Sequence, residues 1–72
     1  MVELRKEDLL SGPETRNTAY GYPMTFVKVM ASNNTAGLRS GDRFSLNGII
    51  YEAKFIEATP TGSGEMLTVT YQ

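Results

Sequence analysis

The stretch from Leu38 to Ala58, LRSGDRFSLNGIIYEAKFIEA, constrains the fold of this chain more than any other segment. It holds Asn47-Gly48 between two apolar runs. This dipeptide is a strong signal of a β-hairpin, because a type I′ turn needs positive φ at both central residues. The sequence therefore predicts a strand over Arg43–Leu46, a two-residue turn, and a long returning strand over Ile49–Ala58.

Alternation along the two strands predicts one buried and one solvated face, because successive side chains of a strand point to opposite sides. The expected buried face carries Phe44, Leu46, Ile49, Tyr51, Ala53 and Phe55. The opposite face of the returning strand carries Ile50, Glu52, Lys54 and Ile56. The charges in its middle indicate that this face is mostly solvated, with Ile50 and Ile56 partly covered. We expect a half-buried antiparallel pair in which Leu46 faces Ile49.

The rest of the chain predicts two further strands and an N-terminal arm. Met24–Met30 is rich in β-branched and aromatic residues, and Glu65–Gln72 alternates apolar and polar residues. Residues 1–10 fit either a helix or a strand, and Ser11-Gly12-Pro13 is expected to end that element. The expected loops are Glu14–Pro23, Ala31–Gly37 and Thr59–Gly64.

These elements predict an all-β fold in a single small domain over residues 1–72. We expect an antiparallel up-and-down sheet of four strands over residues 24–72, curled into a barrel or sandwich, and an irregular arm over residues 1–23. The expected core contains Phe26 or Val27 and Val29, with Leu38, Phe44, Leu46, Ile49, Tyr51, Phe55, Leu67, Val69 and Tyr71. A domain this small often gains its remaining stability by binding copies of itself or a partner.

Composition argues against catalytic and metal chemistry. The chain has no cysteine and no histidine, which removes the thiol nucleophile, the usual general base and the commonest metal ligands. Asp42 fits the cap of a turn, and Gly62-Ser63-Gly64 lacks the lysine of a phosphate-binding loop. We therefore expect no enzymatic activity, no cofactor and no metal site.

The sequence also predicts no membrane association. Residues 1–10 are charged throughout, so we expect no signal peptide. The apolar runs are far shorter than the ~20 residues that span a bilayer.

Polar segments between the strands hold the residues that we expect to bind partners. Tyr20 and Tyr22 flank Gly21, and tyrosines are favoured anchors of interfaces. The alternative is that both rings fold back over an open end of the sheet. The partner-binding residues that we name are Arg16, Tyr20, Tyr22, Asn33 and Asn34. Deletion of residues 1–22 is expected to leave a folded sheet that no longer assembles.

Two weaker functional alternatives come from local patterns. Ala36–Gly48, AGLRSGDRFSLNG, is similar to the stretch of PDZ domains in which Gly-Leu and Gly-Asp precede a strand ending in Asn-Gly. It implies a module that binds a peptide by adding a strand to a sheet edge. Binding of single-stranded nucleic acid through Phe26, Tyr20 and Tyr22 would require a cluster of Arg16, Lys28, Arg39, Arg43 and Lys54. A net charge of −1 disfavours this second alternative.

A longer stretch, from Phe26 to Val69, resembles the head–tail joining proteins of lambda-type tailed phages. In that family an apolar strand, a polar loop and Leu-Arg-x-Gly-Asp precede a short strand, a glycine, an aromatic residue and a long strand. A glycine-containing turn and an apolar last strand complete the pattern. The matching residues are Phe26–Val29, Leu38–Asp42, Gly48, Tyr51, Ile56, Gly64, Leu67 and Val69.

The resemblance implies a structural protein of the bacteriophage virion, made in the cytoplasm of the bacterial host. Members of the family sit in the neck as a connector, where copies form a ring around the DNA channel between the portal side of the head and the tail. The implied partners are other neck, portal or tail proteins and further copies of the same chain. Flexible segments would become ordered on assembly. The near-neutral charge fits a channel lining that does not bind DNA specifically.

Overall fold

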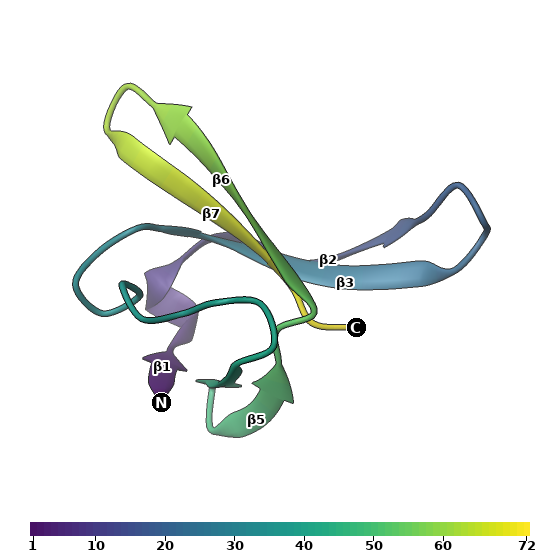
Figure 1. The fold of residues 1–72 in the computed structure, drawn as a ribbon, viewed down its shortest axis with the longest axis horizontal. Coiled ribbons are helices and arrows are strands. Elements are labelled where there is room, and N and C mark those ends of the chain that lie inside the picture. The colour runs from purple at the N-terminus through teal and green to yellow at the C-terminus, as the bar shows by residue number, and fades with distance from the viewer.

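The computed structural model describes residues 1–72 as a mainly β protein with two sheets (Figure 1). One sheet has the order β1-β4-β5, formed by β1 (Val2–Leu4), β4 (Arg43–Leu46) and β5 (Ile49–Glu52). The other has the order β2-β3-β7-β6, formed by β2 (Leu9–Asn17), β3 (Pro23–Met30), β7 (Gly64–Thr70) and β6 (Phe55–Thr61). A short 3-10 helix, η1 (Lys6–Asp8), connects β1 to β2. The predicted all-β, sandwich-like fold is confirmed, and the sheets do not close into a barrel.

The hairpin around Asn47-Gly48 forms as the sequence predicts. The two residues have φ angles of 50° and 85°, as a type I′ turn requires. Leu46 lies opposite Ile49 in the β4–β5 pair. The turn also contacts the N-terminal segment, because the N–H of Asn47 donates to the carbonyl oxygen of Leu4 over 2.9 Å. Local turn chemistry therefore determines the register of this pair.

The predicted returning strand over Ile49–Ala58 is wrong, because the chain changes sheet at Ala53. β5 pairs with β4, whereas β6 pairs with β7 in the other sheet. Ala53 is fully buried at the crossing. Its N–H donates to the carbonyl oxygen of Asp42, and its carbonyl oxygen accepts from the N–H of Gly41, both over 2.8 Å. These two bonds hold the bend.

The bend reverses the expected orientation of the side chains that follow it. Phe55 was expected in the core but is 39% exposed, whereas Ile56, which was expected to be partly covered on the opposite face, packs against the core. Ile49 is 58% exposed, because it lies near the end of a hairpin that extends beyond the four-stranded sheet (Figure 1).

The N-terminal third is mostly strand, which corrects the expectation of an irregular arm over residues 1–23. β1 is a strand that pairs in parallel with β4, and not part of a helix. Its side chains alternate, so that Val2 and Leu4 point toward the core and Glu3 points to solvent. β2 runs through Ser11-Gly12-Pro13 with two register shifts and pairs with β3 as far as Asn17 opposite Pro23. β3 offers a long edge that β2 covers. The chain therefore has seven strands where the sequence predicted four.

The core lies between the two sheets. It consists of Leu4, Val27, Val29, Leu38, Phe44, Leu46, Ala53, Leu67, Val69 and Tyr71. Ala53 belongs to the expected buried face and is buried, whereas Leu4 was not predicted as a core member, because its burial depends on the parallel β1–β4 pair. Phe26 is also buried, but it lies on the outer face of the four-stranded sheet.

An aromatic cluster at the core links the sheets and gives stability a pH dependence. The Tyr71 ring centroid lies 4.5 Å from that of Tyr51 and 5.8 Å from that of Phe44. Burial, and secondarily the neighbouring Tyr51 phenol, raise the pKa of Tyr71 above 10.0. The folded state therefore favours the neutral phenol.

Below pH 10 we expect ionisation of Tyr71 to have no effect on the free energy of unfolding. Above pH 10 the free energy of unfolding is expected to fall as the pH rises through the folded-state pKa of Tyr71. Urea denaturation, followed by circular dichroism at neutral and alkaline pH, measures this loss. The control is Tyr71→Phe, which cannot ionise and is expected to lose less stability at alkaline pH. An equal loss in both chains would contradict the assignment to Tyr71.

Candidate interaction surfaces

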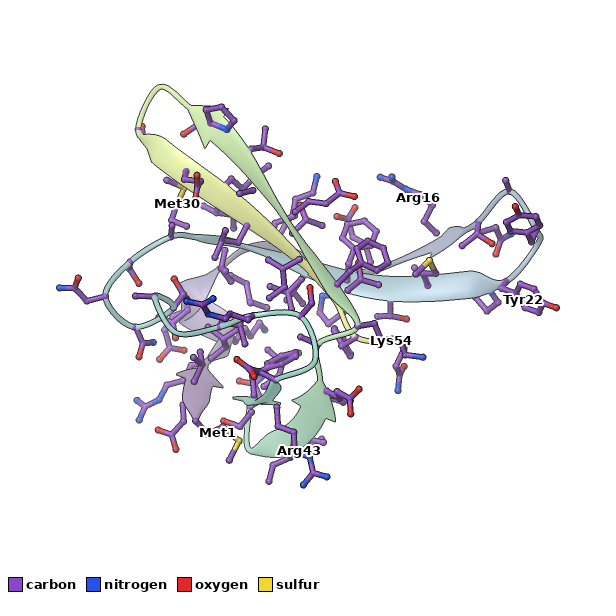
Figure 2. All side chains as sticks on the ribbon, in the orientation of Figure 1. Met1, Arg16, Tyr22, Met30, Arg43 and Lys54 are labelled. Carbon is purple, nitrogen blue, oxygen red and sulfur yellow. The ribbon has the colours of Figure 1, made fainter.

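The β2–β3 hairpin projects from the body of the molecule, and its tip presents two tyrosines to solvent (Figure 1). We define the tip as residues 18–23. Tyr20 is 88% exposed and Tyr22 is 70% exposed, so the alternative that both rings fold back to cover the sheet is wrong. Figure 2 shows Tyr22 at the far end of the hairpin. The predicted tyrosine pair is therefore available to a partner.

Thr18 holds the backbone of the tip. Its N–H donates to the carbonyl oxygen of Tyr22 over 2.8 Å, and its carbonyl oxygen accepts from the N–H of Gly21 over 2.9 Å. Its hydroxyl oxygen accepts from the N–H groups of Tyr20 and Tyr22 over 3.3 Å and 3.2 Å. The tyrosine rings thus extend from a hydrogen-bonded turn. An open hollow of about 530 Å³ lies beside them and is lined in part by Lys54 and Gln72.

A second surface is the side of the four-stranded sheet that faces away from the core, which we call the outer face. Its central hollow measures about 260 Å³ and is lined by Arg16, Met24, Phe26, Lys28, Phe55, Glu57, Thr59, Met66, Thr68 and Thr70. Strand pairing places Phe26 and Phe55 on either side of Thr70. The outer face therefore combines exposed apolar side chains with charges of both signs.

Two cations cover the ring of Phe26 on the outer face. The Arg16 guanidinium lies 5.1 Å from the ring centroid, and the Lys28 ammonium lies 5.9 Å from it. Both distances suit cation–π interactions. Figure 2 shows Arg16 beside the stem of the β2–β3 hairpin. This contact explains how Phe26 is buried without belonging to the core.

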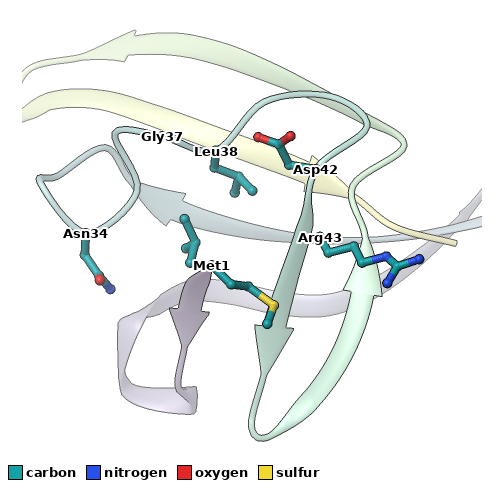
Figure 3. A pocket seen from close by; sticks show the side chains of 7 residues that line it. Met1, Asn34, Gly37, Leu38, Asp42 and Arg43 are labelled. Atoms are coloured by element: carbon teal, nitrogen blue, oxygen red, sulfur yellow. The ribbon is translucent and has the colours of Figure 1, made fainter.

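The predicted residues Asn33 and Asn34 lie far from the hairpin tip, in the loop between β3 and β4 (Figure 1). The side-chain amide of Asn34 donates to the carbonyl oxygen of Glu3 over 3.2 Å. Asn34 also lines an open hollow of about 480 Å³ together with Met1, Val2, Gly37, Leu38, Asp42 and Arg43 (Figure 3). The structure thus brings Arg16, Tyr20 and Tyr22 onto one hairpin and leaves the two asparagines elsewhere.

The basic groove required for nucleic-acid binding does not form. Arg16 and Lys28 line the outer face, Lys54 lines the hollow at the tip, and Arg43 lines the hollow of Figure 3. Phe26 is only 6% exposed, so its ring is not available for stacking with a base. The nucleic-acid alternative is therefore disfavoured.

Several residues of the outer face were missed by the sequence analysis. Alternation in β3 and β7 places Met24 and Lys28, and likewise Met66 and Thr68, on one face. The sequence contained that signal. Phe55 could not be assigned to this face, because the change of sheet at Ala53 alters the alternation.

The structure contains neither a cluster of metal ligands nor a membrane-spanning helix. No group of three or more histidine, cysteine, aspartate or glutamate side chains is placed to hold a metal ion. The side chain of Asp42 accepts from the N–H of Arg39 over 3.1 Å, as the cap of a turn does. No helix is long and apolar enough to cross a bilayer.

A scan of protein-family models, a search of curated proteins and a search of solved structures each found no significant match to this chain.

Deletion of residues 1–22 is now expected to unfold the chain, which corrects the expectation of a folded remnant. The deletion removes both β1 and β2, and with them Leu4, which is only 2% exposed. Loss of a buried leucine side chain alone costs about 2–5 kcal/mol. Circular dichroism and urea denaturation of residues 23–72 measure the effect. A cooperative transition close to that of the full chain would contradict it.

Proposed function

We propose that this chain is a structural virion-assembly protein of a tailed phage or prophage, without catalytic activity. Specifically, it is a head–tail joining component that forms a ring between the portal side of the head and the tail. Its partners are neck, portal or tail proteins and further copies of itself.

The observation that carries the proposal is the tip of the β2–β3 hairpin. Tyr20 and Tyr22 are 88% and 70% exposed there, on a backbone held by Thr18. Tyrosine is enriched among the residues that dominate binding energy in protein interfaces. Such a projecting aromatic tip supports a role in contacting other proteins.

The positions of the turns also support the proposal. Gly41, Gly48 and Gly64 belong to the stretch that resembles head–tail joining proteins, and they have φ angles of 92°, 85° and 129°. Glycine enters this region without the steric cost that other residues meet. The glycines of the resemblance therefore lie where the backbone of this β fold requires them.

Quantitative mass spectrometry of purified particles tests the proposal. The sample is the phage or induced prophage that encodes this chain, with the major capsid protein counted as an internal control. A few copies per particle, as one ring would hold, are expected. Hundreds of copies would indicate a capsid or tail-tube protein instead, and absence from the particle would overturn the proposal.

The second candidate is a peptide-binding module, and its support is the open edge of β5. Ile49 and Ile50 are 58% and 57% exposed on this edge strand. A PDZ-type groove is disfavoured, because η1 is the sole helical element and no helix lines the strand. Titration with C-terminal peptides separates the candidates, since saturable micromolar binding favours the module.

A further inference from the structure

The chain exposes more surface than a monomer of its size usually does. Its accessible surface is 4923 Å² for a mass of 7.9 kDa. Monomeric proteins of this mass expose about 4,400 Å². The excess is roughly 500 Å², or about three fifths of the ~800 Å² that each partner contributes to a standard interface. The projecting hairpins of Figure 1 account for this open shape, and they offer area for association.

The tip of the β2–β3 hairpin has the chemistry of an inserted anchor. Residues 18–23, TAYGYP, carry no charge. Tyrosine rings supply a large contact area with few rotatable bonds, and the hydroxyl retains a hydrogen-bonding group. An uncharged aromatic tip can pack against a surface that carries both signs of charge without repulsion.

The outer face offers a matching acceptor. Its hollow of about 260 Å³ is below the ~300–1,000 Å³ of typical small-molecule sites, so it suits an inserted side chain. Phe55 is 39% exposed beside it and offers an aromatic contact. Arg16 and Lys28 are positioned to interact with a second ring, and Glu57 and Thr68 can bond to a phenol hydroxyl.

Neither tyrosine of the tip lines the outer-face hollow of its own molecule. β2 and β3 remain paired to Asn17 and Pro23, directly before the turn, so the hairpin stays extended. The donor and the acceptor are also two different surfaces of one chain. Contact between different surfaces of identical copies is heterologous, and its repetition generates a closed ring or an open filament.

The geometry points to head-to-tail association of copies of this chain, in which the hairpin tip of one copy packs into the outer-face hollow of the next. This inference rests on the proposed function, because it names the surfaces through which a ring of copies would form. Tyr20 and Tyr22 are the inserted residues, and Phe55, Arg16 and Lys28 form the wall that receives them.

Disulfide trapping between copies tests the contact, and the absence of native cysteine removes any background. Ala19→Cys marks the tip and leaves both tyrosines in place, while Thr68→Cys marks the hollow. The two variants carry different tags, are mixed at high concentration and are oxidised. The control donor is Ser63→Cys, which lies at the exposed β6–β7 turn. Circular dichroism first establishes that each variant is folded.

We expect the Ala19–Thr68 pair to cross-link at least tenfold faster than the Ser63–Thr68 pair. Addition of Tyr20→Ser and Tyr22→Ser to the Ala19→Cys chain is expected to remove most of this difference. Equal rates for tip and control, or a dominant Ala19–Ala19 product from a symmetric contact, would overturn the inference. So would a rate that the tyrosine substitutions leave unchanged.

The same variants in assembled particles separate this inference from the proposed function. A few copies per particle without the Ala19–Thr68 cross-link would retain the neck assignment and overturn the head-to-tail contact. The cross-link in purified protein, with the chain absent from particles, would retain the contact and overturn the neck assignment.

Discussion

Phe44→Ala is expected to lower the free energy of unfolding by about 3–5 kcal/mol. Phe44 is fully buried between the sheets, and its ring centroid lies 5.8 Å from that of Tyr71 and 6.1 Å from that of Tyr51. Removal of the ring leaves a cavity between the two sheets, and the surrounding strands cannot move in to fill it. A domain of this length has a total stability of only about 4–11 kcal/mol, so the expected loss is a large fraction of it.

Urea denaturation followed by circular dichroism measures this loss, and Phe55→Ala is the matched control. The control removes the same side chain from a position that is 39% exposed on the outer face. We expect it to cost less than half as much stability. Equal losses in the two variants would show that the core is not centred on Phe44.

Gly12→Ala is expected to lower the free energy of unfolding by about 3 kcal/mol. Gly12 has a φ of 98°, a conformation that side chains with a Cβ adopt only at a cost. An added Cβ would lie 2.9 Å from the carbonyl oxygen of Phe26 and 3.1 Å from the Cα of Val27. Both atoms belong to the backbone of β3, which is central in its sheet and has little room to move.

The control for this variant is Gly37→Ala. Gly37 lies in the loop before β4, and a Cβ added there would meet no atom within 4 Å beyond its own chain neighbours. We expect a change within about 0.5 kcal/mol. Chemical denaturation of both variants gives the comparison. A Gly12→Ala chain as stable as the Gly37→Ala chain would contradict the close approach of β2 to β3.

The parts of the fold that depend on residues close together along the chain were predictable from the sequence. Asn47-Gly48 and the alternation beside it give the β4–β5 pair and its register. The change of sheet at Ala53 was not predictable, because the hydrogen bonds that hold it come from the backbone of Gly41 and Asp42. The alternation from Ile49 onward continues without any Gly or Pro to mark the break.

Of the two candidate surfaces, one was recognisable from the sequence and the other was not. The tyrosines of the tip were recognisable, because they flank a glycine outside the strongest strand patterns. The outer face required knowledge of strand order, since it joins Arg16, Phe26 and Phe55 from three strands. The sequence also could not show that the side chain of Asn34 bonds to the backbone of Glu3, because the two segments are distant along the chain.

The parallel pairing of β1 with β4 has a consequence for the order of folding. A hydrogen bond beside this pair joins Lys6 and Asn47, which are 41 residues apart, so closing it costs chain entropy that local hairpins avoid. Hairpins such as β2–β3 form in about 1–10 μs, whereas contacts distant in sequence slow folding. The aromatic tip would thus be formed and exposed before the sandwich closes, and nascent copies at high concentration would meet through that hairpin first.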